Sequence, residues 1–252
     1  MKLIPRFIAR FFHKFSSPPY FYMMTGKMLP WLTAIFLVLM AYGLYGGLIL
    51  APTDYQQGES YRIIYIHVPS AWMSLFIYVS MAISGAIALI WRIKLAEIVM
   101  ISSAPVGAAF TFLALVTGSL WGKPMWGTWW VWDARLTSEL VLLFLYFGVM
   151  ALYGAIEDKR SASRAVAILA LVGVVNIPII HYSVEWWNTL HQGATVAKFD
   201  KPSMDISMLI PLLVMSFAFK FYYLIAMFQQ ARTELLMRER NSQWVEILLE
   251  KS

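Results

Sequence analysis

Long apolar stretches alternate with short polar connections along most of this chain. A helix needs about 20 apolar residues to cross the hydrocarbon core of a bilayer, and six stretches reach that length. The pattern therefore predicts an all-α integral membrane protein with six transmembrane helices, near residues 30–51, 63–91, 98–118, 138–156, 165–184 and 206–228. Residues 30–228 are predicted to form one membrane domain, with an outer Trp-rich loop at 119–138.

The two ends of the chain have a different pattern. Basic residues interrupt the apolar positions of residues 1–29, and Ser16-Ser17-Pro18-Pro19 breaks the segment. A signal peptide has one uninterrupted apolar core before a small-residue cleavage site, so we expect no cleavage and an amphipathic segment on the cytoplasmic surface. Residues 229–252 place apolar residues at helical spacing among charges, which predicts a cytoplasmic surface helix.

Composition supports a membrane protein and excludes several kinds of site. The 252 residues are 60% hydrophobic and 13% charged, with a mean hydropathy of +0.64, whereas a soluble domain is about half apolar and a quarter charged. The chain has no cysteine, which excludes disulfides, thiolate metal sites and a Cys nucleophile. It also lacks a Gly-x-x-x-x-Gly-Lys-Ser/Thr loop, so nucleotide hydrolysis is not expected. The net charge of +6 does not indicate a nucleic-acid partner.

Basic residues concentrate on one side of the predicted membrane. Fourteen Lys and Arg residues lie in the N-terminal segment, the second and fourth connections and the C-terminal tail, whereas five lie in the opposite connections. Cytoplasmic loops carry the excess of Lys and Arg, so both termini are predicted to be cytoplasmic. The Trp-rich loop then faces outward, which is the periplasmic side of the inner membrane in a Gram-negative bacterium.

The stretch Trp126-Gly127-Thr128-Trp129-Trp130-Val131-Trp132-Asp133 contains four tryptophans in eight residues. It follows Gly118, Gly122 and Pro124, which are typical of irregular backbone, so we expect a loop or short helix at the membrane surface. One interpretation is an aromatic belt at the lipid–water boundary. The other is a platform for a flat, largely apolar ligand, because Trp offers a large rigid face. The density of the cluster and its ending in Asp133-Ala134-Arg135 favour the platform.

This stretch resembles the tryptophan-rich (WWD) signature of the haem-handling proteins of cytochrome c biogenesis. The resemblance rests on Gly127-x-x-Trp130-x-Trp132-Asp133 preceded by Trp126. The flanks Trp121-Gly122-Lys123-Pro124-Met125-Trp126 and Asp133-Ala134-Arg135-Leu136-Thr137-Ser138-Glu139-Leu140 are similar to one branch, cytochrome c maturation protein C, the haem-delivery subunit. The likeness extends from about Pro30 to Gln192. It implies that Trp126, Trp129, Trp130, Trp132 and Asp133 contact haem or shape its surface.

Three of the four histidines fall at outer helix ends or in outer loops, where an ionisable side chain is a functional candidate. His67 lies in Tyr65-Ile66-His67-Val68-Pro69-Ser70, and His191 follows the Trp186-Trp187 pair. The resemblance implies that these two are the axial ligands of the haem iron, a role that suits imidazole. A His67 bonded only to a neighbouring helix and a solvated His191 are the alternatives.

His181 is a reserve ligand candidate. It follows Pro178, which has no amide hydrogen for the carbonyl of Val174. Either Asn176 or His181 is expected to repair this local hydrogen bonding, which gives His181 a structural role.

Arg62 and Arg135 are candidates for the two haem propionates. Both are predicted on the outer side, where Arg is scarce, and a guanidinium binds a carboxylate with two parallel hydrogen bonds. Anchoring to lipid headgroups is the alternative for both.

The resemblance implies a binding and transfer subunit more than an enzyme. Without cysteine, the haem is held non-covalently and transiently, as haem b. The expected partners are the haem chaperone (cytochrome c maturation protein E), the ATP-binding-cassette pair (proteins A and B), the small membrane subunit (protein D) and membrane lipid. Two rival functions stay open at this point: a b-type electron-transfer subunit with a permanent haem between two His, and a permease whose Trp loop is a gate.

Overall fold

The computed structural model describes residues 17–187, 189–191, 193, 196 and 201–250. Helices make up most of these residues and no strand occurs among them. The elements in chain order are α2 (Pro18–Tyr45), η1 (Gly46–Leu50), η2 (Glu59–Ile63), α3 (Ile64–Trp91), α4 (Lys94–Trp126), α5 (Ala134–Ala155), α6 (Lys159–Gly173), α7 (Asn176–Trp186), α8 (Ile206–Arg238) and α9 (Gln243–Glu250). Six helical stretches are long and apolar enough to cross a membrane, so the predicted fold class is confirmed.

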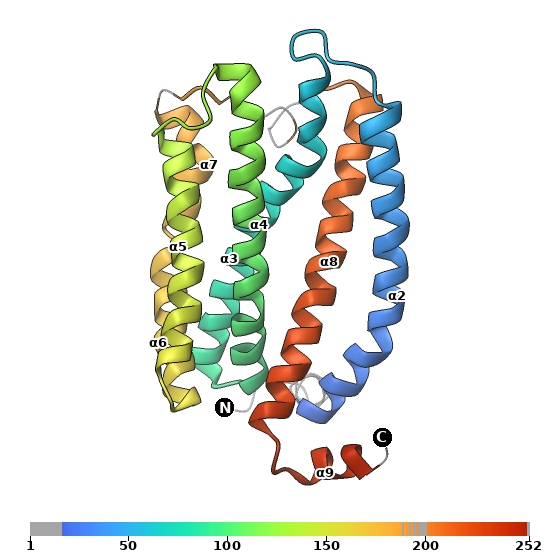
Figure 1. Cartoon of the computed structure of the whole chain (residues 1–252). Helices are drawn as coiled ribbons and strands as arrows, with labels where there is room; N and C mark the ends of the chain where they lie inside the picture. Colours follow the sequence, from blue (N-terminus) through green and yellow to red (C-terminus); the bar gives the residue numbers. More distant parts are fainter. Residues whose placement is uncertain (1–16, 188, 192, 194–195, 197–200, 251–252) are drawn as a thin grey trace.

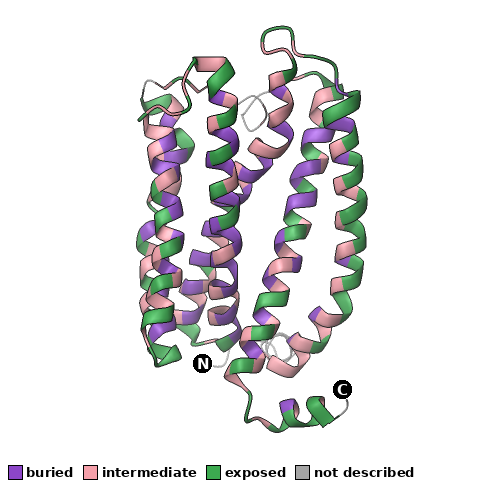
Figure 2. Cartoon of the chain, in the orientation of Figure 1, coloured by how far each residue is buried: buried purple, intermediate pink, exposed green. Residues whose placement is uncertain are grey.

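Helix α4 lies at the centre of the bundle and is the most buried of the six spans. Helix α3 packs along it, α5 to α7 lie on one side, and α2 and α8 lie side by side on the other (Figure 1). Figure 2 shows that buried residues gather on α3 and α4, while α2 is largely exposed. The end of α4 and the start of α5 therefore meet at one end of the bundle, which places the Trp-rich connection there.

The first spanning helix begins earlier than the apolar pattern predicts. Helix α2 starts at Pro18 instead of near Pro30, and Pro30 lies inside it. Proline suits the first turn of a helix because the amide hydrogen that it lacks has no helical partner there. The segment from Pro18 onward is held to α8, where the guanidinium of Arg232 lies 3.7 Å from the ring centre of Tyr22. Residues 1–16 of the predicted N-terminal segment lie outside the described part of the chain.

The expectation of irregular backbone at Gly118, Gly122 and Pro124 was wrong. Helix α4 continues through all three and ends at Trp126. A proline near the end of a helix removes only one internal hydrogen bond, and a side chain at Gly122 would collide with the ring of Trp126. The helix ends at Gly127, whose φ of 76° is left-handed and typical of a glycine that follows a helix.

The fifth span is broken into α6 and α7, and the hydrogen bonds at the break differ from the expectation. The carbonyl of Val174 accepts from the amide of Ile177 at 3.0 Å. The side chain of Asn176 donates instead to the carbonyl of Ser138 on α5, at 2.9 Å. Neither Asn176 nor His181 repairs the Val174 carbonyl, because the chain turns between the two helices before Pro178 is reached.

At the opposite end, α8 continues to Arg238 and the separate short helix α9 folds back beneath α2 (Figure 1). Trp244 of α9 packs against Tyr22 of α2, with ring centres 5.7 Å apart. The start of α2 and helix α9 thus lie at the end of the bundle remote from the Trp-rich connection.

Candidate functional site

The predicted site residues come from five parts of the chain that end on the same side of the bundle (Figure 1). They lie in η2 (Arg62), the first turn of α3 (His67), the end of α4 (Trp126), the connection and start of α5 (Trp129, Trp130, Trp132, Asp133, Arg135) and the segment after α7 (His191).

His67 is held against α4 through one ring nitrogen. Its Nδ1 lies 3.1 Å from the carbonyl oxygen of Ala114 and 3.1 Å from Oγ1 of Thr117. A carbonyl oxygen only accepts, and the Thr117 hydroxyl donates its own proton to Leu113 at 2.6 Å. Nδ1 is therefore the protonated nitrogen, and Nε2 keeps a free lone pair.

Two further residues fix the position of the His67 ring. Gly118 leaves room for it, because a Cβ at that position would lie 3.0 Å from His67 Cε1. Trp121 meets the imidazole edge to face, with ring centres 5.6 Å apart. The indole nitrogen of Trp121 donates to Oε1 of Gln57 at 2.9 Å, which ties α4 to the loop before η2.

His191 is held by a carboxylate and an indole. Its Nδ1 lies 3.0 Å from Oδ2 of Asp133, and its ring centre is 4.7 Å from that of Trp126 at 69°. Burial lowers the pKa of His191, Asp133 opposes the shift and Arg135 adds to it. A neutral imidazole results, with Nδ1–H donated to Asp133 and Nε2 left as a potential ligand atom.

Asp133 performs two tasks with its two oxygens. Oδ1 accepts from the amide of Leu136 at 2.8 Å and caps the first turn of α5. Oδ2 holds His191, which lies 58 positions further along the chain. The side chain is only 5% exposed, so the start of α5 and the position of His191 depend on one buried carboxylate.

The four tryptophans do not form a single flat surface. Trp126 packs on His191, and Trp130 meets Trp132 edge to face at 75° with ring centres 5.4 Å apart. Trp132 is 74% exposed and Trp129 is 54% exposed. The Nε1 of Trp130 is buried without a hydrogen-bond partner among the described residues. The cluster therefore combines two packed rings with two exposed ones.

The two predicted arginines have different surroundings. Arg62 donates from Nε to Glu59 and from Nη1 to the carbonyl of Gly47 at 3.0 Å. Arg135 is half-buried at the start of α5 and interacts electrostatically with Asp133 and Glu139. His181, the reserve candidate, lies exposed on α7 with its ring against Tyr182, at 4.7 Å between ring centres.

Sequence reasoning did not select the residues that support His67, namely Gln57, Ala114, Thr117, Gly118 and Trp121. The spacing of the last four on α4 was the available signal. Positions 114, 117, 118 and 121 lie on one face of a helix, but only the packing of α3 on α4 shows that this face meets His67.

The arrangement supplies two imidazoles, each with Nδ1 bonded and with no partner for Nε2 among the described residues. Among the described residues, no group of three or more His, Asp or Glu side chains is arranged to hold a metal ion.

Comparisons with known proteins point in the same direction. The sequence profile of the heme exporter protein C family matches residues 11–246, a range that includes every candidate site residue. Heme exporter protein C of Haemophilus influenzae is 51% identical over 239 residues, which cover 95% of this chain and 97% of that protein. Heme exporter protein C of Escherichia coli K12 is 53% identical over 239 residues, 95% and 96% of the two chains. A Marchantia polymorpha mitochondrial protein, named as a candidate for cytochrome c biosynthesis, is 49% identical over 183 residues, 73% and 77% of the two chains.

Proposed function

The chain belongs to the heme exporter protein C family, and on this premise we propose that it delivers haem for the maturation of c-type cytochromes. In this proposal it holds haem b non-covalently between His67 and His191 at the outer face of the inner membrane. It then presents the haem to the periplasmic chaperone, cytochrome c maturation protein E. The observation that carries the proposal is that both imidazoles have Nδ1 bonded, while neither Nε2 has a partner in the part of the chain that the structure describes.

The residues around the two histidines have distinct tasks in this proposal. Trp126 and Asp133 orient His191, while Trp129, Trp130 and Trp132 cover part of the porphyrin and exclude water. Trp130 also brings a buried Nε1–H that lacks a partner among the residues described. Arg135 and Arg62 bind the propionates, and Arg62 offers Nη2 because its Nε and Nη1 are occupied.

The chain acts as one subunit of a larger assembly. We propose that the ATP-binding-cassette pair, cytochrome c maturation proteins A and B, and the small membrane protein D complete it. The bond-forming residue belongs to the chaperone, so this chain binds and positions haem. The free Nε2 atoms and the exposed Trp129 and Trp132 support a site from which haem leaves.

The experiment compares haem absorption spectra of the purified protein, prepared with and without the chaperone. His67→Ala and His191→Ala are each expected to perturb the spectrum, and His181→Ala is the matched control that leaves it nearly intact. Loss of the spectrum in His181→Ala alone would show that the second ligand is assigned wrongly. A haem that never leaves in the presence of the chaperone would indicate a permanent electron-transfer haem, and absence of haem would indicate a permease.

The orientation has a separate test. Reporter fusions after Lys159 and after Ser252 are expected to be cytoplasmic, and fusions within residues 190–200 to be external. A cytoplasmic signal near Gln192 would remove the basis for an outward-facing site.

A further inference from the structure

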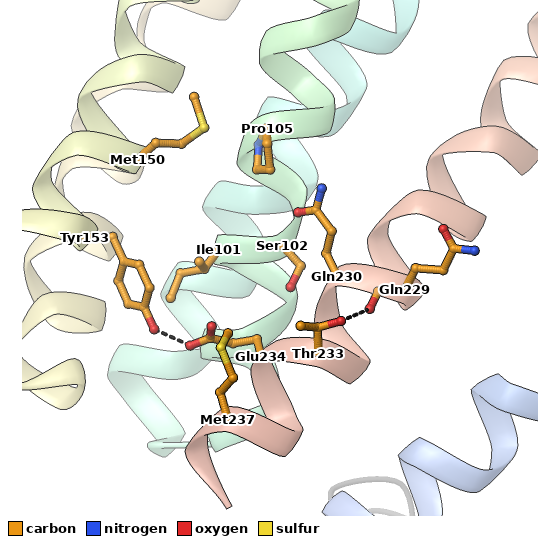
Figure 3. Close-up of a pocket in the computed structure, with 10 residues that line it drawn as sticks. All are labelled: Ile101, Ser102, Pro105, Met150, Tyr153, Gln229, Gln230, Thr233, Glu234 and Met237. Atoms are coloured by element: carbon orange, nitrogen blue, oxygen red, sulfur yellow. Dashed lines mark hydrogen bonds between the residues drawn. The ribbon is translucent and has the colours of Figure 1, made fainter. Parts of the chain in front are cut away.

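A second polar site lies at the opposite end of the bundle, in a cleft between α4, α5 and α8 (Figure 3). The cleft has a volume of about 410 Å³. Ile101, Pro105, Met150 and Met237 give it an apolar lining. Because all three helices are membrane spans, an occupant of this cleft reaches it along the membrane and needs an apolar part.

The floor of the cleft has a hydrogen-bond donor and an acceptor without their usual partners. Ser102 is 3% exposed, and its hydroxyl has no hydrogen-bond partner within the described chain. Pro105 has no amide hydrogen for the carbonyl of Ile101, one position before Ser102. An unpaired polar group is costly in a membrane, so the Ser102 hydroxyl indicates a polar ligand.

The wall formed by α8 contributes a carboxylate with one oxygen available. Oε1 of Glu234 accepts from the hydroxyl of Tyr153 and, at 2.7 Å, from Nε of Arg238. Oε2 of Glu234 has no partner in the part of the chain that the structure describes. Figure 3 shows the Glu234 carboxylate beside Tyr153 at the cleft, and the side chain of Gln230 extending from α8 toward Pro105.

The carboxylate oxygen that is left without a partner at the cleft favours a cationic hydrogen-bond donor. Arg238 is already bound to Glu234 and, at 2.9 Å, to Glu97. Lys94 is bound to Glu239 at 2.7 Å. The ammonium of Lys159 lies 4.7 Å from the ring centre of Tyr153, so three cations match the three carboxylates, and the acceptor that remains without a partner among the described residues is Oε2 of Glu234. An anionic ligand would meet repulsion here, whereas an ammonium group would complete the pairing.

We propose that this cleft binds the headgroup of a phospholipid that carries a primary ammonium group, such as phosphatidylethanolamine. The ammonium is bound by Oε2 of Glu234, with the carbonyl of Ile101 and the amide oxygen of Gln230 as further acceptors. The hydroxyl of Ser102 donates to an ester or phosphate oxygen of the same lipid. The acyl chains lie against the apolar lining and the lipid-facing surface of α4 and α5.

The chemistry of the headgroup separates this proposal from general lipid contact. Phosphatidylcholine has the same net charge but no N–H donor, and phosphatidylglycerol is anionic and lacks the ammonium. A site built on a charge-assisted hydrogen bond should therefore prefer the ethanolamine lipid over choline by about tenfold, and the glycerol lipid should bind most weakly.

The experiment is a lipid titration of the purified full-length chain, followed by native mass spectrometry with each of the three phospholipids. Glu234→Gln is expected to abolish the preference for the ethanolamine lipid. Ser102→Ala is expected to lower the binding affinity for that lipid several-fold. Glu97→Gln is the matched control, because it also removes a carboxylate from Arg238 but does not line the cleft. The haem spectrum of all three variants provides an independent measure of the outer site and shows that they are folded.

Three outcomes would overturn the proposal. Equal binding of the glycerol and ethanolamine lipids would show that the cleft does not select an ammonium. If Glu97→Gln and Glu234→Gln lost the preference for the ethanolamine lipid equally, the effect would come from the ion-pair network instead of the cleft. A photo-crosslinker at Met150 that labels a peptide of another subunit in the assembled complex, with no lipid adduct, would show that a protein helix occupies the cleft.

Discussion

His67 and His191 offer the same ring atom to a ligand but are held by very different parts of the molecule. His67 lies in a long helix and is bonded to the helix packed against it, with two acceptors for one N–H. His191 lies in the segment between α7 and α8, and its ring depends on Asp133 and Trp126. Among the described residues, His67 is thus fixed by helix packing, whereas His191 is fixed by one carboxylate and one indole. We therefore expect the His191 half of the proposed site to be the half that moves when haem is released.

The largest effect is expected in the pair of Trp130 and Trp132, whose rings pack edge to face in the connection before α5. Single Trp130→Ala or Trp132→Ala variants should still bind haem, because each aromatic contact contributes on the order of 1 kcal/mol beyond its buried area. The rate of haem transfer to the chaperone should fall far more, because misplacement of the reacting groups by ~1 Å can cost ~100-fold in rate. The measurement is haem staining of the chaperone beside the spectrum of this protein in the same membranes. Normal chaperone loading in the double variant would leave only the interfacial belt as the role of the cluster.

The second-largest effect, a loss of haem retention, is expected when the carboxylate that holds His191 is removed. Changing a residue that orients a metal-bound histidine costs roughly 10- to 100-fold in affinity, and this range is expected for haem retention in Asp133→Ala. Asp133→Asn sharpens the test, because its amide oxygen can still cap α5. Its amide nitrogen, facing Nδ1 of His191, favours the tautomer with the proton on Nε2, where it blocks the ligand atom. Asp133→Asn should therefore accumulate normally and still lose haem. Haem retention equal to the natural protein would show that the Asp133–His191 bond has no functional role.

A side chain at Gly118 tests the helix-packed half. Its Cβ would lie 3.0 Å from Cε1 of His67, and overpacking of this kind costs about 1–3 kcal/mol. Gly118→Ala should weaken haem retention about fivefold at the lower end of that range and shift the absorption spectrum. Gly154→Ala is the control, because a Cβ there has no neighbour within 4 Å. Equal haem retention and equal absorption spectra in the two variants would show that the fit around His67 is not tight.

The sequence predicted the helices better than the contacts between their side chains. Apolar length alone identifies six spans, because any helix in lipid must satisfy its own backbone. It does not reveal where a helix stops beyond the hydrocarbon core, so the predicted helix ends near Gly118 and omits Trp121, which packs against His67. The bond between Asp133 and His191 joins positions 58 residues apart. Only the fold brings such positions together, and a motif that ends in Asp does not state which partner that Asp binds.

The smallest effect is expected at Thr117, and it measures the asymmetry between the two histidines directly. Thr117→Val keeps the shape of the side chain but removes the oxygen that lies 3.1 Å from Nδ1 of His67. The carbonyl of Ala114 remains at 3.1 Å, and it is a backbone atom that no substitution removes. One neutral hydrogen bond contributes about 0.5–1.5 kcal/mol, and with the second acceptor in place we expect about a twofold loss of haem retention. The informative quantity is the ratio between this loss and that of Asp133→Asn, measured by titrating haem into both purified variants. A ratio near one would mean that both ligands depend equally on a single partner. A tenfold or larger ratio would show that packing of α3 on α4 holds His67 without its side-chain partner, while His191 relies on Asp133.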